Sequence, residues 1–189
     1  LYTKFVRCAP GLCLESIREA TAQRRTQSIA AAPTPRLEAT LRLLYHYCEG
    51  VRPAPGMKVV MRNENFCSLL VALHNSGVTS RPHREVLCLY YDTAIRYFPI
   101  FQQKEHTHLL SRVLQAITGA RGLQHDHPRV RSRSCYLLLR LVKSVASLLR
   151  PFVETAVSGI QGLLSNPNLE LRPDDTLYLF ETMGLLLGK

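Results

Sequence analysis

Apolar residues recur along this chain at intervals of three or four positions. Leu37, Leu41, Leu44 and Cys48 show the pattern clearly, because they fall on one face of a helix with about 3.6 residues per turn. Residues 50–61 hold two prolines and two glycines and are predicted to form a loop. No segment alternates apolar and polar residues over the length of a strand, so the chain is predicted to be all-α. The predicted helices span about residues 12–31, 35–49, 62–76, 82–98, 103–118, 128–144, 153–164 and 173–187.

Four prolines arrange these helices into a repeat. Pro35, Pro82, Pro128 and Pro173 each open the second helix of an apparent pair, at spacings of 47, 46 and 45 residues. Paired helices at this period are typical of HEAT and armadillo repeats, which stack because one pair cannot bury its apolar face alone. The alternative is an irregular helical bundle in which the prolines coincide by chance. We predict an α-α superhelix (solenoid) of about four helix pairs, a single segment over 1–189 with repeats near 10–50, 62–99, 103–148 and 151–188.

The central predicted helix carries its charge at an unusual end. Its first turns hold Arg129, Arg131 and Arg133, although the partial positive charge at a helix N-terminus favours carboxylates. Arginines beside unpaired helix amides suit an anion such as a phosphate. On a helical wheel Arg140 and Lys143 continue the stripe of Arg129 and Arg133, and Arg131 lies to one side. We predict that these five side chains contact phosphates; the alternative is a solvated polar face.

The composition favours an acidic partner. Formal net charge is +10, which suits nucleic acid, an anionic membrane surface or an acidic protein, although many soluble domains are basic for no specific reason. Arginines on other predicted second helices could extend the basic surface: Arg36, Arg42, Arg84 and Arg96.

The six cysteines indicate a reducing compartment. They are scattered through apolar runs without a Cys-x-x-Cys pair, so we interpret them as reduced, buried thiols of a cytosolic or nuclear protein. The chain begins at Leu1 and shows neither a signal peptide nor an apolar run long enough to cross a membrane. We expect a segment cut from a longer protein, with no membrane insertion.

Motifs for metal binding and catalysis are missing from the sequence. His106 and His108 lie two positions apart on a predicted helix and do not face each other, and His125 and His127 flank an aspartate in a loop. Neither pair has a convergent third or fourth ligand, so no metal site and no cofactor are expected. The acidic residues at 174–175 suit the first turn of a helix. The sequence contains neither a glycine-rich phosphate loop nor a nucleophile elbow, so we expect that the protein is not an enzyme.

Several blocks of residues resemble one family closely. The most specific are Val130-Arg131-Ser132-Arg133 and Asp174-Asp175 followed by Glu181-Thr182-x-Gly184. They are similar to the middle region of the exportin-T family, the tRNA exportins of the importin-β (karyopherin) superfamily. The resemblance implies stacked HEAT repeats; residues 23–28 and the loop 50–61 match it poorly. Further matching blocks lie at 42–45, 75–80, 122–125, 141–144 and 151–154, so that the resemblance covers roughly residues 35–187 in the family's order.

The resemblance implies a nuclear export receptor. Such a receptor binds mature tRNA together with Ran-GTP in the nucleus, crosses the pore through contacts with nuclear pore proteins, and releases its cargo in the cytoplasm. It implies shuttling between nucleus and cytoplasm, recognition of tRNA mainly by shape and backbone, and Ran contacts made mostly by parts absent from this chain. The alternative is a HEAT-repeat scaffold for protein–protein interaction without RNA binding. Cations gathered on one face would favour the first function, and scattered cations the second.

Overall fold

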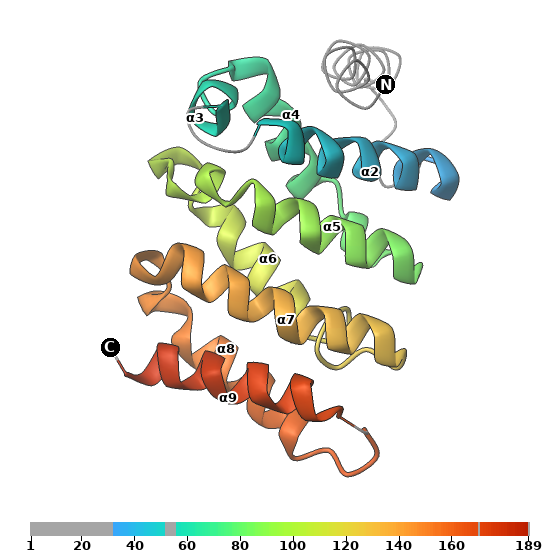
Figure 1. The fold of residues 1–189 in the computed structure, drawn as a ribbon, viewed down its shortest axis with the longest axis vertical. Helices are drawn as coiled ribbons and strands as arrows, with labels where there is room; N and C mark the ends of the chain where they lie inside the picture. The colour runs from blue at the N-terminus through green and yellow to red at the C-terminus, as the bar shows by residue number, and fades with distance from the viewer. Residues whose placement is uncertain (1–31, 52–55, 170, 189) are drawn as a thin grey trace. The chain divides into compact units, whose positions relative to one another are not determined.

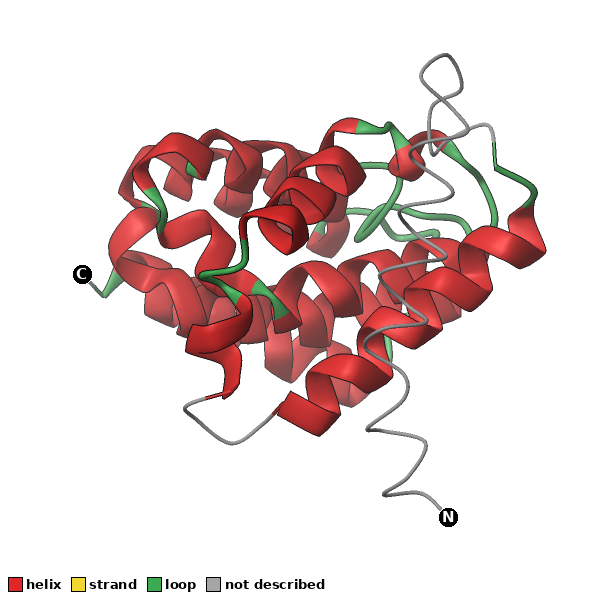
Figure 2. Ribbon diagram, turned by 90° about the horizontal axis from the view of Figure 1, so that it is seen from above, coloured by secondary structure: helices red, strands yellow, loops and turns green. Residues whose placement is uncertain are grey.

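The computed structural model describes residues 32–51, 56–169 and 171–188, and every regular element in these ranges is helical. The chain divides into two compact units, residues 1–100 and 101–189. Figure 2 shows the described elements as helices joined by short loops. The prediction of an all-α fold built from repeated helix pairs is confirmed. The helix predicted over 12–31 lies outside the described residues, and a single four-repeat segment over 1–189 stays a prediction.

In the first unit, α2 (Thr34–Val51) lies beside α5 (Arg84–Arg96), and α4 (Glu64–Asn75) runs between them in sequence (Figure 1). Short elements complete this part of the chain: α3 (Gly56–Val60) and 3-10 helices at Val78–Ser80 and, after α5, Phe98–Gln102. Leu41 and Leu44 of α2 are fully buried, and the phenol of Tyr97 donates to the carbonyl of Leu44 over 2.8 Å. The apolar face read from the sequence is therefore the one that packs.

In the second unit, α7 (Pro128–Val145) lies beside α9 (Pro173–Leu187), while α6 (His108–Thr118) packs against α8 (Val153–Leu164) (Figure 1). First helices thus pack on first helices and second helices on second helices, as expected for stacked pairs. Three 3-10 helices, Lys104–His106, Ala146–Leu148 and Arg150–Phe152, connect these elements. The arrangement leaves one long side of α7 exposed beside α9.

Three predicted boundaries are wrong. The loop predicted over 50–61 contains α3, because packing on α2 and burial of Val60 outweigh the weak helical tendency beside two prolines. The helix predicted from 103 begins only at His108, since the hydroxyl of Thr107 donates back to the carbonyls of Phe101 and Gln103 and supports tighter turns there. Pro82 precedes its helix by two residues, because extended His83 is the N-cap of α5.

Candidate nucleic-acid interface

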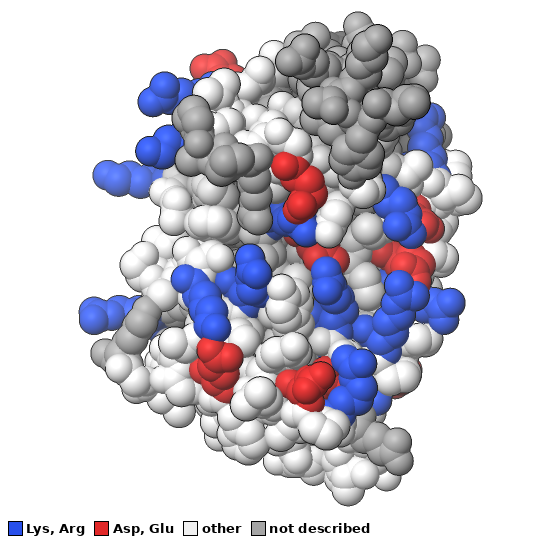
Figure 3. All heavy atoms as spheres, in the orientation of Figure 1, with Lys and Arg blue, Asp and Glu red and all other residues white. Residues whose placement is uncertain are grey.

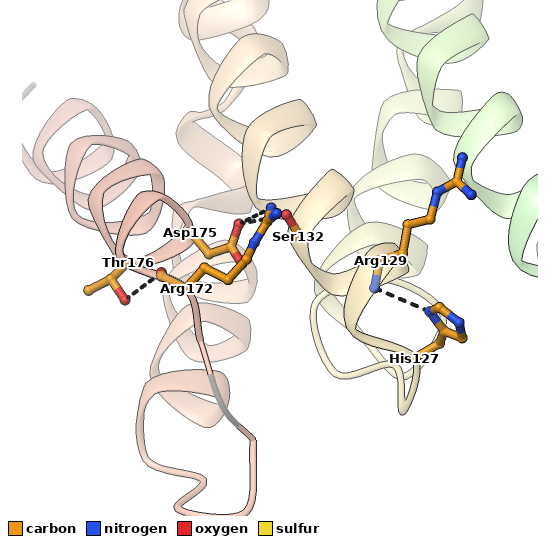
Figure 4. Close-up of polar contacts among 6 residues, drawn as sticks. All are labelled: His127, Arg129, Ser132, Arg172, Asp175 and Thr176. Carbon is orange, nitrogen blue, oxygen red and sulfur yellow. Dashed lines mark hydrogen bonds and ion pairs between the residues drawn. The ribbon is translucent and has the colours of Figure 1, made fainter.

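The N-terminus of α7 is organised by two histidine side chains. His127 is the N-cap, and its Nδ1 accepts from the backbone amide of Arg129 over 3.2 Å (Figure 4). His125 accepts in turn from the amide of His127 over 2.9 Å. Burial lowers the pKa of His125, with smaller contributions from neighbouring cations against the opposing effect of Asp126. A neutral imidazole keeps Nδ1 available as an acceptor, so this loop holds the start of the helix.

Arg131 takes part in the same loop. Only 6% of this residue is exposed, and its Nη1 donates to the carbonyls of His125 (3.0 Å) and Asp126 (2.7 Å). These bonds tie the loop to the first turns of α7 and agree with the position of Arg131 off the basic stripe. Its predicted contact with phosphate is not tested by these bonds and stays a prediction.

The other four predicted side chains share one long side of α7, where Arg129, Arg140 and Lys143 are exposed and Arg133 is half-buried. Tyr136 lies among them at the same helical spacing. We call Arg129, Arg133, Tyr136, Arg140 and Lys143 the α7 row. Figure 3 shows lysine and arginine side chains gathered over this helix, with acidic side chains over the neighbouring α9. Sequence analysis missed Tyr136, although its spacing of three and four from Arg133 and Arg140 was readable.

Two contacts connect α7 to α9. Buried Asp175 accepts from the hydroxyl of Ser132 over 2.7 Å and from Arg172 through Nε and Nη2, each over 3.2 Å (Figure 4). At the other end, Nζ of Lys143 lies 2.6 Å from Glu181 of α9. The sequence predicted that Asp175, in the first turn of its helix, interacts with the helix dipole. In the structure it also connects α9 to α7 through its hydrogen bond with Ser132. These contacts hold the α7 row in place, and they offset part of the charge at Lys143.

Three arginines on the other second helices have carboxylate partners on their own unit. Arg42 pairs with Glu38 over 2.7 Å, and Arg96 pairs with Glu49 and also stacks on Tyr45, with its guanidinium carbon 3.9 Å from the ring centroid. Arg84 lies 3.7 Å from Glu85. Such pairs reduce the local positive potential. On α7 the cations share one side of the helix, and Lys143 among them pairs with Glu181.

Potential metal ligands and cysteine thiols are the remaining candidates for site chemistry among the described residues. Within the described ranges, no group of three or more potential ligands could hold a metal ion, and no helix there is long and apolar enough to cross a membrane. Cys48, Cys67, Cys88 and Cys135 are buried. Burial, followed by the charge of Asp175, raises the pKa of Cys135 to about 12, so this thiol stays protonated at neutral pH.

Comparison with known proteins gives one consistent family. The Exportin-T family model matches residues 13–189. Human exportin-T is 30% identical over 197 aligned residues, covering 99% of this chain and 20% of the relative. Exportin-T of Pongo abelii is 31% identical with the same coverage, and that of Arabidopsis thaliana is 28% identical over 96% of this chain and 18% of the relative. The chain thus spans about a fifth of the length of these relatives, and it belongs to the exportin-T family.

Proposed function

We propose that this chain is a segment of a nuclear export receptor that binds tRNA together with Ran-GTP and carries it from the nucleus to the cytoplasm. Membership of the exportin-T family supports the receptor role. The proposal places Ran contacts mostly in parts of the receptor outside this chain and includes contacts with nuclear pore proteins during shuttling. The contribution of this chain is one patch of a basic surface that holds the RNA backbone.

The observation that carries this proposal is the α7 row. These cations, Arg129, Arg133, Arg140 and Lys143, share one side of a helix, and the ion pair of Lys143 with Glu181 fixes the end of the row on α9. Arginine donates in a planar fork that matches two phosphate oxygens, so three arginines on one side suit a phosphate backbone better than a single anion. Binding that releases counterions from RNA is sequence-independent, as recognition by shape and backbone requires.

The test is tRNA binding to the full-length receptor, with Ran-GTP present, across a salt series between about 50 and 200 mM. One variant carries Arg129→Ala, Arg133→Ala and Arg140→Ala. The control loses equal charge on other elements of the same unit: Lys104→Ala, Arg112→Ala and Arg150→Ala, all exposed residues. Each lost phosphate contact should reduce the log–log salt slope by roughly 0.7–0.9, so the first variant should bind more weakly with a slope flatter by about 2–3.

The control variant should keep most of the affinity and slope, because its charges lie off the α7 row. If both variants lost affinity and salt slope equally, the loss would reflect the lower net charge and not contacts made by the α7 row. Unchanged affinity and slope in the first variant, with the protein still folded, would move the RNA site away from α7.

A second candidate function is a HEAT-repeat scaffold for protein partners without RNA binding. The observation that favours it is an apolar stripe on α9, where Leu177, Phe180 and Leu187 are each about 60% exposed. Exposed apolar stripes of this kind mark protein–protein contacts. Affinity for tRNA that persists only at low salt, with equal loss in both triple variants, would favour the scaffold.

A further inference from the structure

Tyr136 makes contact with two arginines of the α7 row at once. The guanidinium carbon of Arg133 lies 5.3 Å from the centroid of its ring, and that of Arg140 lies 6.0 Å away. Both distances are within the range of a cation–π interaction. Nη1 of Arg140 also donates to the phenolic oxygen of Tyr136 over 3.3 Å. One aromatic side chain therefore restrains two cations on either side of it.

The ring of Tyr136 is itself held by the neighbouring helix. Its centroid lies 5.6 Å from that of Tyr178 on α9, with an angle of 64° between the ring planes. This edge-to-face geometry is favourable for aromatic pairs. Because Ser132 bonds to Asp175 one turn earlier and Lys143 pairs with Glu181 two turns later, the segment around Tyr136 is braced against α9 on both sides. The ring is a fixed platform and not a freely rotating side chain.

We propose that Tyr136 is a positioning residue for RNA binding, which holds Arg133 and Arg140 so that each meets a different phosphate of the tRNA backbone. This inference rests on the proposed function of the α7 row. The two arginines are seven residues apart, which places their Cα atoms about 10 Å apart along the helix axis. That separation is too large for one phosphate group and suits two groups of the backbone.

The physical reason is pre-organisation. A free arginine loses much rotamer freedom when it grips a phosphate, and a side chain already restrained loses less. A guanidinium can stack its face on an aromatic ring while its N–H edge donates to phosphate oxygens, so the two contacts do not compete. Tyr136 thus raises the affinity for RNA without adding charge.

The test uses the full-length receptor with Ran-GTP and tRNA, and compares Tyr136→Leu with Tyr136→Phe. Each cation–π contact at an exposed site contributes a factor of about two to five, so loss of both contacts in Tyr136→Leu should weaken tRNA binding by about four- to 25-fold. The salt slope should stay unchanged, because all cations remain. Tyr136→Phe keeps the ring and loses only the long hydrogen bond from Arg140, so it should bind within about twofold of the unsubstituted protein. Equal losses in both variants, or a slope that flattens, would overturn the role of the ring.

A thermodynamic cycle separates positioning from simple structural damage. Tyr136→Leu is also introduced into a receptor that already carries Arg133→Ala and Arg140→Ala. If Tyr136 acts through these arginines, the extra substitution should leave tRNA affinity unchanged. A further loss in that background would refute positioning, even if Tyr136→Leu lowers the thermal stability of the protein. If the arginine substitutions leave tRNA affinity unchanged, the proposed RNA site on α7 is wrong. If they weaken tRNA binding and Tyr136→Leu does not, only the positioning role of Tyr136 is wrong.

Discussion

The tight approach of α8 to α6 makes Gly159 the more demanding of the two glycines of α8. A Cβ atom added at this position would lie 2.6 Å from Cβ of Thr118 and 3.1 Å from the carbonyl oxygen of the same residue. Thr118 is buried, and its hydroxyl donates to the carbonyl of Leu114 over 2.8 Å. The contacted atoms belong to the backbone and the branch point of a short side chain, so they cannot move aside without shifting a helix.

We expect Gly159→Ala to lower the free energy of unfolding by about 1–2 kcal/mol. Overpacking costs about 1–3 kcal/mol, and a contact of 2.6 Å with atoms that cannot move places this site in the upper part of that range, at about 2–3 kcal/mol. The better helix propensity of alanine returns about 1 kcal/mol. Gly162 on the same helix is the matched control, because its nearest neighbour would be Nε2 of Gln124 at 3.4 Å, the movable end of a long side chain. Gly162→Ala should therefore stabilise the protein by about 0.5–1 kcal/mol through propensity alone.

The assay is urea unfolding of the two variants and the unsubstituted chain, supported by thermal melts. At about 2–4 °C per kcal/mol for a chain of this size, the two variants should differ in Tm by roughly 3–12 °C. If Gly159→Ala were as stable as Gly162→Ala, or more stable, the close packing of α8 on α6 would be refuted.

Two further predictions concern buried polar groups. His74 is buried with Nδ1 3.0 Å from the hydroxyl of Tyr90, and desolvation lowers its pKa to about 4. Because the pKa of histidine in the unfolded chain is about 6.5, this contribution to the free energy of unfolding is fully present above pH 6.5 and should fall by up to about 3 kcal/mol as pH drops towards 4. Urea unfolding at several pH values should show a weaker dependence of stability on pH for His74→Gln than for the unsubstituted chain. Equal pH dependence in the two proteins would contradict this prediction. Asp175→Asn should lower the free energy of unfolding by about 1–3 kcal/mol, because it weakens the hydrogen bond to Ser132. The control Asp174→Asn, at an exposed site, should change the free energy of unfolding in urea by less than about 0.5 kcal/mol. Similar effects of the two substitutions would contradict a stabilising role for the hydrogen bond between Asp175 and Ser132.

Helix positions were predictable where local signals agreed. The helix read from Pro173 to Leu187 has those bounds in the structure, and α7 begins at Pro128 as expected. Proline is tolerated in the first turn because its missing amide would have no partner there. The signals failed at α3, where two nearby prolines and a glycine indicate a loop and burial of Val60 decides otherwise.

Sequence by itself determined that this chain is all-helical, that its helices come in pairs, and that one of them carries a row of cations, because periodicity and chain breakers are local properties. Only the tertiary structure decided what the cations of that helix contact. It buries Arg131 against two loop carbonyls and pairs Lys143 with Glu181. It also brings Tyr178 against Tyr136, 42 positions away. Such contacts depend on how neighbouring helices pack, and spacing within a single helix carries no information about its neighbour.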